Sequence, residues 1–193
     1  MALSIVTEPE LIPVSLSDAK ARLRVTSSQE DSDITSMIKS ATRWAEHELN
    51  WRLLTQTWKY FLDGWPGDII RMPYPPLQSI THIKYYDGDD AQQTLVENTD
   101  FRVDTASYPA RIEVINGWPS IYNKVLPIEI QFICGFTANS LIVEDIKDAI
   151  FLRVADLYEN RQNSMIGSGR QAVIENVETS HNLLMRYKLY NEV

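Results

Sequence analysis

The side chains that could carry chemistry include three histidines, and none of them lies in a recognisable site. His47 stands between Glu46 and Glu48 in a predicted helix, and it has no histidine or carboxylate three or four positions away. A metal site on a helix needs ligands at that spacing. His82 falls in a predicted strand, and His181 falls near the start of the last predicted helix. We therefore predict that the histidines neither bind a metal ion nor act in catalysis.

The single cysteine, Cys134, excludes a disulfide within the chain and a metal site built from cysteines. It follows Phe132 and Ile133, in a segment that supplies neither a base nor a positive charge to activate a thiolate. We therefore expect a buried structural thiol in a cytosolic chain.

Carboxylates gather at the predicted starts of two helices. The two groups are Glu30, Asp31 and Asp33, and Glu144, Asp145 and Asp148. Acids at these positions cap free backbone N–H groups and complement the positive end of the helix dipole. Alternatively, they would form the metal site of a nuclease, which would also need a basic groove for its substrate. The composition shows no such groove, so the structural explanation is favoured.

Two loops resemble ligand-binding motifs only in part. Residues 87–90, Asp-Gly-Asp-Asp, begin like a calcium loop, but the sixth position is Gln92 rather than glycine and the twelfth is Asn98 rather than glutamate. Residues 167–170, Gly-Ser-Gly-Arg, lack the longer glycine frame and the lysine of a P-loop. We expect a hairpin turn and a flexible loop instead. The sequence thus predicts no enzyme activity and no catalytic, cofactor-binding or metal-binding residue.

Composition and charge narrow the function further. The chain has 193 residues and a formal net charge of −8, with 26 acidic against 18 basic residues. This balance argues against a protein that binds nucleic acid by neutralising its phosphates. The hydrophobic content of 44% is that of a folded globular chain. The sequence starts without a basic leader and lacks an apolar run of about 20 residues, so we expect no membrane association.

Periodicity divides the chain into helices, then strands, then helices. Ser15 and Asp18 form a capping box ahead of a short helix to about Val25, and apolar spacings of three and four predict a long helix from Ile34 to about Asn50. Seven strands follow, rich in aromatic and β-branched residues. They cover residues 57–62, 68–72, 79–86, 93–96, 101–103, 111–115 and 128–134.

Two further helices are predicted after the strands, over residues 143–161 and 178–190, with a flexible loop at 162–170 between them. Because the strands are consecutive rather than alternating with helices, the fold class is α+β. The expected architecture is a bundle of two N-terminal and two C-terminal helices with an antiparallel β insertion. The parts of this single domain, residues 1–193, are the N-terminal helices at 15–50, the insertion at 55–135 and the C-terminal helices at 143–190.

Several segments, taken in order, resemble one family along almost the whole chain. They are Pro13–Val25, Leu54–Trp58, Met72–Ile80, Pro109–Ile112, Trp118-Pro119, Ile128–Phe132, Gly135-Phe136, Ile146–Arg161 and Leu183–Tyr187. Their order and spacing are similar to those of tailed-phage head–tail connector proteins, the gp6-like group and the related phiE125 gp8 family. One departure is Cys134, where these proteins often carry a small residue before the glycine.

The resemblance implies a structural role rather than a catalytic one. Such connectors form a ring beneath the portal, where they complete the head, retain the packaged DNA and offer the tail a docking surface. The implied partners are further copies of the chain in a twelve-fold ring, the portal protein, and a tail-side stopper or tail completion protein. DNA would pass through without specific binding, because acidic walls weaken contacts with phosphates. The implied location is the head–tail junction of the virion, with assembly in the host cytoplasm.

Two sets of side chains are predicted to make these contacts. Trp44 and Trp51 lie seven positions apart on the predicted long helix, so we expect them to share an edge that faces a neighbouring subunit or the sheet. Trp65 and Trp118 fit an interface and the core equally well. In the family the C-terminal segment commonly reaches toward the portal. The residues expected to dock there are Arg186, Tyr187, Leu189 and Tyr190.

Two other functions stay open on the sequence alone. One is a metal-dependent enzyme that assists DNA packaging, with the acidic helix starts as its site. The other is a regulatory or adaptor module outside virions. Metal binding distinguishes the first from a connector, and the presence of the chain in purified particles distinguishes the second.

Overall fold

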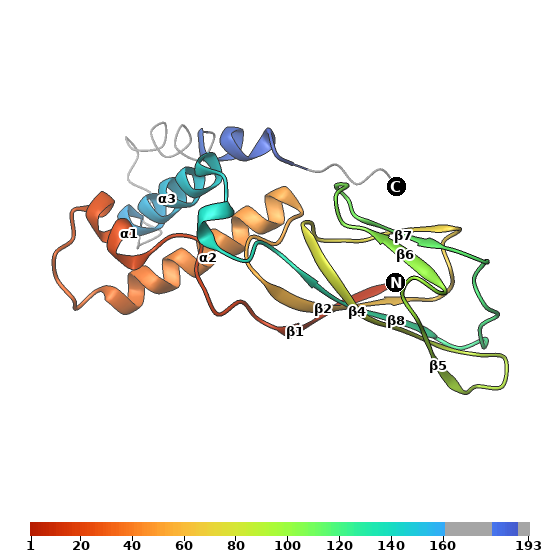
Figure 1. Ribbon diagram of the computed structural model, residues 1–193. Helices are drawn as coiled ribbons and strands as arrows, with labels where there is room; N and C mark the ends of the chain where they lie inside the picture. Colours follow the sequence, from red (N-terminus) through yellow and green to blue (C-terminus); the bar gives the residue numbers. More distant parts are fainter. Residues whose placement is uncertain (161–178, 189–193) are drawn as a thin grey trace. The chain divides into compact units, whose positions relative to one another are not determined.

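The computed structural model describes residues 1–160 and 179–188 and has an α+β fold (Figure 1). The chain divides into two compact units. Met1–Glu10 and Leu54–Phe136 form the β unit, while Leu11–Leu53 and Thr137–Val193 form the helical unit. The N-terminal segment thus belongs with the strands. No helix in the described part of the chain is long and apolar enough to cross a membrane.

The helical unit starts with two helices, as the sequence predicts. Helix α1, Leu16–Leu23, begins at Ser15, whose hydroxyl oxygen accepts a hydrogen bond from the backbone N–H of Asp18 at 3.0 Å. Helix α2, Asp31–Leu49, ends at Asn50, which adopts the left-handed conformation with φ 58°. Its buried residues recur at spacings of three and four and confirm the predicted apolar stripe. They are Ile34, Ile38, Ala41, Ala45 and Leu49.

Helix α3, Glu144–Glu159, packs against α2, and its buried residues complete the apolar core of this unit. A 3-10 helix, Asn139–Leu141, precedes it. A further helix covers residues 179–185, where Leu184 is buried. The sequence predicts that this helix reaches residue 190. In the described part of the chain, which continues to residue 188, the helix ends at residue 185. The N–H of Tyr187 donates to the carbonyl of Leu184 at 2.9 Å, which closes a tight turn there. The loop predicted at 162–170 lies outside the described residues.

The β unit contains two antiparallel sheets. Their strand orders are β1-β2-β8-β4-β5 and β3-β7-β6. The strands of the larger sheet are β1 Ala2–Thr7, β2 Gln56–Leu62, β8 Ile128–Cys134, β4 Leu77–Tyr86 and β5 Gln92–Leu95. Those of the smaller sheet are β3 Ile69–Arg71, β7 Arg111–Val114 and β6 Phe101–Asp104. All seven predicted strands are present, each within two residues of its predicted bounds.

Alternating side chains from both sheets build one apolar core in the β unit. In β8 every second residue is buried and the residues between are half-buried, as expected for a strand with one face on the core. The members of the core include Ile128, Ile130, Phe132 and Cys134 from β8, Leu77 and Ile83 from β4, and Ile70, Phe101 and Ile112 from the smaller sheet. The core therefore depends on strands that are distant in sequence.

Strand β1 is an element that the sequence does not predict. All six of its residues are exposed, so they show no alternation between a core face and a solvent face. Backbone pairing with β2 holds it in place, from Ala2 opposite Phe61 to Thr7 opposite Thr57. It is an edge strand, because β2 is its neighbour on one side and the sheet ends on the other.

The turn between β4 and β5 is wider than predicted. The strands pair as far as Tyr86 opposite Gln92, so five residues form the turn instead of a tight Asp87-Gly88 pair. The carboxylate of Asp87 accepts hydrogen bonds from the N–H of Asp89 at 3.0 Å and of Ala91 at 3.1 Å. These bonds favour the wider turn, because the carboxylate of Asp87 satisfies backbone N–H groups inside the turn.

Candidate interaction surfaces

The acids at the two helix starts do not converge on one point. Asp31 pairs with Lys20, which ties α2 to α1. Asp148 pairs with Arg22 at 2.7 Å, which ties α3 to α1. The acids at the start of α2 and those at the start of α3 are therefore each tied to α1 by one ion pair. Such partly exposed pairs contribute modestly to stability but fix the positions of the helices.

Two further acids accept hydrogen bonds from tyrosines. The Tyr158 hydroxyl donates to Glu30 Oε2 at 2.7 Å, and the Tyr187 hydroxyl donates to Asp145 Oδ2 at 2.9 Å. Each bond joins segments of the helical unit that are distant in sequence. Carboxylates held in this way position helices, and their separate partners give no shared centre for a metal ion.

His82 and His181 each lie beside a different carboxylate, Glu129 and Glu48. His47 is exposed on α2, and His181 Nδ1 lies 3.3 Å from Glu48 Oε2. Within residues 1–160 and 179–188, no group of three histidine, cysteine or carboxylate side chains is placed to hold a metal ion. The described residues thus give no support to the nuclease alternative.

A polar network crosses the five-stranded sheet at Glu129 of β8. Its Oε1 atom lies 3.0 Å from His82 Nε2 on one side and 3.0 Å from Lys59 Nζ on the other. Burial acts to raise the pKa of Glu129, but the hydrogen bonds from His82 and Lys59 outweigh it and lower the pKa. The three side chains come from neighbouring strands, so the network links β2, β8 and β4.

Cys134 and Gly135 lie at a crowded backbone crossing at the end of β8. Cys134 is fully buried, which confirms the prediction of a buried thiol. Gly135 has φ +95°, and its N–H donates to the carbonyl of Pro76 at 2.8 Å. A Cβ atom at Gly135 would lie 2.1 Å from the carbonyl oxygen of Leu54. Only glycine fits this position, because both the φ angle and the space exclude a side chain.

Trp44 and Trp51 do not share an edge of the long helix. Helix α2 ends at Leu49 and the chain turns at Asn50, so Trp51 lies beyond the helix and the expectation of a common helical edge is wrong. Trp44 is half-buried, and the Arg153 guanidinium lies over its ring, 5.5 Å from the centroid. Their contact with a neighbouring subunit stays a prediction.

Trp65 and Trp118 pack on each other in the β unit. Their rings are stacked, with centroids 4.4 Å apart and planes 9° from parallel. The indole of Trp65 donates to the carbonyl of Pro119 at 2.9 Å, and that of Trp118 donates to the carbonyl of Gly67 at 2.6 Å. Both rings also pack against the apolar core. Of the two interpretations open from the sequence, this favours the core.

The residues predicted to dock on the portal stand at the end of the described chain. Arg186 is exposed, and Tyr187 is half-buried with its hydroxyl on Asp145. This hydrogen bond, together with burial, raises the pKa of Tyr187. Leu189 and Tyr190 lie outside the described residues. Arg186 is thus available for a partner, whereas Tyr187 already contributes to the fold.

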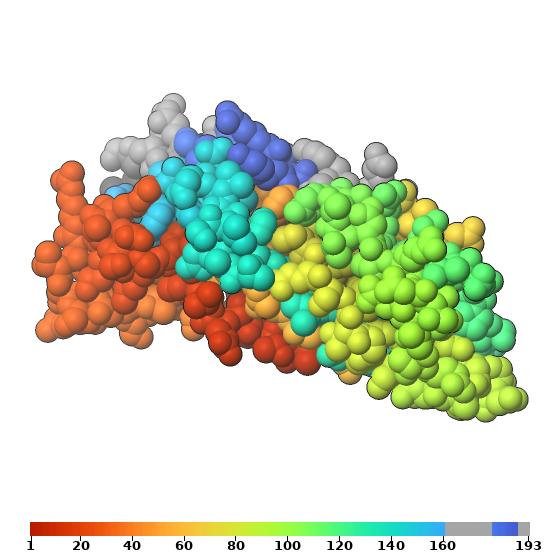
Figure 2. Space-filling model, in the orientation of Figure 1, coloured from red at the N-terminus to blue at the C-terminus, as the bar shows by residue number. Residues whose placement is uncertain are grey.

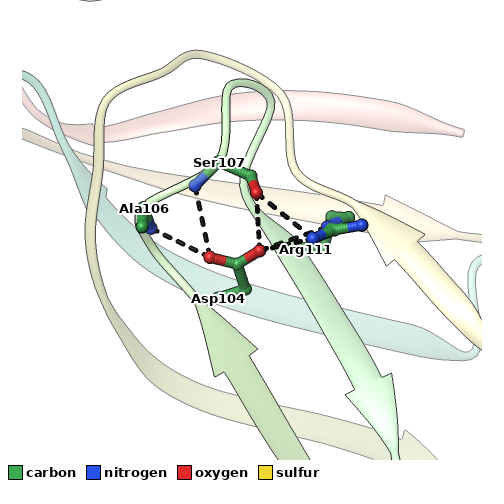
Figure 3. Close-up of polar contacts among 4 residues, drawn as sticks. All are labelled: Asp104, Ala106, Ser107 and Arg111. Carbon is green, nitrogen blue, oxygen red and sulfur yellow. Dashed lines mark hydrogen bonds and ion pairs between the residues drawn. The ribbon is translucent and has the colours of Figure 1, made fainter.

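A groove that sequence reasoning missed lies on the outer face of the three-stranded sheet. It has a volume of about 450 Å³, and it is lined by Ile69, Arg102, Val103, Asp104, Arg111 and Glu113. Asp104, one of the lining residues, accepts hydrogen bonds from the Ser107 hydroxyl at 2.6 Å and from Arg111 Nη2 at 2.7 Å (Figure 3). The Ser107 bond and then the Arg111 bond lower the pKa of Asp104 well below its usual range. The sequence signal was weak, because these residues come from three separate strands.

Replacement of Asp104 by asparagine is expected to destabilise the protein at neutral pH and to matter less in acid. A carboxylate whose pKa is lowered by folding stabilises the folded state above its unfolded pKa of about 3.9, and this stabilisation is lost as the pH falls through the folded pKa. The advantage of the wild type over Asp104→Asn should therefore shrink below about pH 4. Urea unfolding across this range measures it, with Asp89→Asn as the exposed control. A difference that stays constant with pH would contradict the assignment.

The sequence matches a known family over part of its length. Residues 13–86 match the family described as phage gp6-like head-tail connector protein, a stretch that runs from before α1 to the end of β4. This confirms the resemblance found in the sequence. No curated protein matches the chain.

Solved structures of gene transfer agent particles contain chains with the same fold. A chain in the virion of the native gene transfer agent particle gives a TM-score of 0.79 at 21% identity. Chains in the neck of the empty particle, computed with C6 symmetry, and in the neck of the native particle, computed with C12 symmetry, give TM-scores of 0.77 and 0.73, each at 22% identity. In all three comparisons the match covers 100% of this chain and 98% of the other chain. The likeness thus extends over both units of the fold.

Proposed function

We infer that this chain is a head–tail connector, a structural component of the neck of a phage-like particle. The observation that carries this is the match of residues 13–86 to the gp6-like connector family. The similarity of the whole fold to neck chains of gene transfer agent particles supports it from an independent direction. The protein acts by contact with other proteins and catalyses no reaction.

The connector works as a ring. Two of the similar chains come from necks computed with C6 and with C12 symmetry, which supports a closed ring of copies, twelve in the virion. Exposed apolar side chains along the edge strand β1, namely Leu3, Ile5 and Val6, support association, because open sheet edges with apolar side chains tend to pair with another chain. Trp44 and Trp51 remain the proposed contacts of the helical unit with a neighbouring subunit.

The ring lies beneath the portal at the head–tail junction, after assembly in the host cytoplasm. There it completes the head, retains the DNA and gives a tail-side stopper or tail completion protein its docking surface. The charge distribution supports passage of DNA without binding. The β unit holds twelve acidic and six basic residues, a net charge of −6, whereas the helical unit carries −2. An acidic surface repels phosphates and keeps DNA contacts short-lived.

Within this function the two units have different tasks. The helices of residues 15–50 and 143–190 form the frame of one connector domain, residues 1–193, and the strands of 55–135 are inserted in it. The continuous stripe of α2 and its packing against α3 support a rigid frame. The hydrogen-bonded turns and open edges of the strands give the insertion more surface for partners.

Analytical ultracentrifugation of the chain, alone and with its cognate portal protein, tests the proposal. We expect association into a ring and a stable complex with the portal. A chain that stays monomeric at every concentration and never binds the portal would contradict it.

Docking on the portal is expected to depend on the end of the chain. A variant that lacks residues 189–193 and carries Arg186→Glu leaves every described residue but one intact, so its fold should be retained. We expect its affinity for the portal to fall about tenfold or more, with unchanged self-association. The full-length Lys39→Gln variant, changed at an exposed position of α2, shifts the net charge by the same −1 and is the control. Portal binding at the wild-type level in the shortened variant would show that docking uses another surface.

A further inference from the structure

Half of the basic residues of the β unit lie on one face of its three-stranded sheet. We call this the arginine face: Arg71 on β3, Arg102 on β6 and Arg111 on β7. All three are exposed, on the side opposite the buried residues Ile70 and Ile112 of the same strands. The β unit as a whole has twice as many acids as bases. Its positive charge is therefore concentrated here, while negative charge prevails over the rest of the unit.

Asp104 and Glu113 share this face with the three arginines, so its positive charge exceeds its negative charge by one. Arg71 lies directly opposite Arg111 in the antiparallel pairing of β3 and β7. Like charges at such positions repel each other. Arg111 has a carboxylate partner in Asp104, with Nη2 at 2.7 Å and Nε at 3.2 Å from Oδ2 (Figure 3). Arg102 lies opposite Glu113 in the pairing of β6 and β7, but neither Arg102 nor Arg71 forms an ion pair within 4 Å with any residue in 1–160 or 179–188. Two guanidinium groups thus remain free to bind an anion.

The groove beside these arginines favours an acidic peptide over DNA. Its lining combines guanidinium groups with Ile69, which is 44% exposed. A carboxylate binds arginine through two parallel hydrogen bonds, and an apolar contact beside it adds shape specificity. Asp104 and Glu113 lie in the same groove and would repel a continuous row of phosphates. The fitting ligand is therefore a short segment with a few carboxylates.

The β4–β5 turn has the complementary charge. Its carboxylates are Asp87, Asp89 and Asp90, and Lys124 pairs with Asp90 at 2.8 Å. The hydrogen bonds from the backbone to Asp87 order the turn before any partner arrives, which lowers the entropy lost on binding. No ion pair joins this turn to the arginine face among the described residues. The two surfaces of one copy are thus free for two different neighbours.

We propose that the arginine face of one copy binds the acidic β4–β5 turn of the next copy. A contact between two different surfaces repeats from copy to copy and closes into a ring when the rotation allows. This proposal rests on the ring of the proposed function and names one of its contacts. It also predicts that salt weakens assembly, because the contact is made between exposed charges.

Two variants separate the two halves of the contact. The face variant carries Arg71→Glu and Arg102→Glu, and the turn variant carries Asp89→Lys and Asp90→Asn. Asp87 and Asp104 stay in place because they hold the local fold. In sedimentation velocity runs at about 0.05 M and 0.5 M salt, each variant should associate about tenfold or more weakly than the wild type at low salt. Combining both sets of changes should restore association, since the charges are exchanged across the contact.

A control and a mixing experiment make the test independent of changes in net charge. Arg24→Glu with Lys39→Glu changes the net charge as much as the face variant does, at exposed positions of the helical unit. This control should assemble like the wild type. The face variant retains its turn and the turn variant retains its face, and their two changed surfaces are also complementary, so an equimolar mixture should associate at low salt more strongly than either variant alone. No association in the mixture, no rescue in the combined variant, or equal weakening by the control would overturn the proposal. Absence of the chain from particles would instead contradict the proposed function.

Discussion

Replacement of Gly135 by alanine is expected to cost about 3 kcal/mol or more of folding free energy. Two effects add at this position. The φ angle of +95° is one that residues with a side chain rarely adopt, and the new Cβ would lie 2.1 Å from the carbonyl oxygen of Leu54. The obstacle is backbone, so it cannot rotate away as a side chain would. Because the N–H of Gly135 also donates to Pro76, relief of the clash would break this crossing.

Two other glycines provide matched controls for Gly135→Ala. Gly67 has φ +130° with no atom within 4 Å of an added Cβ, so Gly67→Ala adds backbone strain without a clash. Gly88 has neither obstacle, so Gly88→Ala should be close to neutral. Thermal unfolding should rank the losses Gly135 > Gly67 > Gly88. At about 2–4 °C per kcal/mol for a chain of this size, Gly135→Ala should lower Tm by roughly 6 °C or more. A loss equal to that of Gly67→Ala would mean that the crossing is not tight.

Replacement of Phe132 by alanine is expected to cost about 3–5 kcal/mol. Phe132 is the largest of the fully buried side chains and lies on β8, the central strand of the five-stranded sheet. Its removal leaves a cavity among residues of both sheets, which a rigid sheet pair fills only in part. The core of the β unit is therefore the part of the chain most sensitive to a single truncation.

The control for Phe132→Ala is the same change at a half-buried phenylalanine of the same sheet. Phe61 on β2 lies opposite Glu129, on the side of the sheet away from the core. Phe61→Ala should therefore cost about 1 kcal/mol, from lost apolar contact without a closed cavity. Guanidinium unfolding followed by tryptophan fluorescence measures both changes. Equal losses at the two positions would contradict a core centred on β8.

The helices were predicted accurately because their determinants are local. The Ser15 cap and the apolar spacing of α2 are visible in a few consecutive residues, and the structure confirms both. Strands with one face on the core carry a similar local signal, which is why seven of them were found. Strand β1 carries none, because all its residues are exposed and only pairing with β2, about fifty residues later, makes it a strand.

The surfaces were harder to predict than the elements. Trp44 and Trp51 have helical spacing, but the helix ends between them, at a left-handed turn on Asn50. Asparagine also occurs inside helices, so the sequence does not show that the helix ends at this residue. The groove of the three-stranded sheet is lined by residues from β3, β6 and β7. The pairing register of these strands brings the residues together. Such registers depend on the whole sheet, so the arginine face could not be found from spacing along the chain.

The presence of this chain in purified particles tests the connector function most directly. Quantitative mass spectrometry of particles separated from host proteins on a density gradient would measure its copy number relative to the portal protein. A structural connector predicts that the chain is present at a fixed ratio, equal to that of the portal subunits for a twelve-fold ring, in every particle that contains the portal. Particles that contain the portal and a tail but lack this chain would contradict the proposed function.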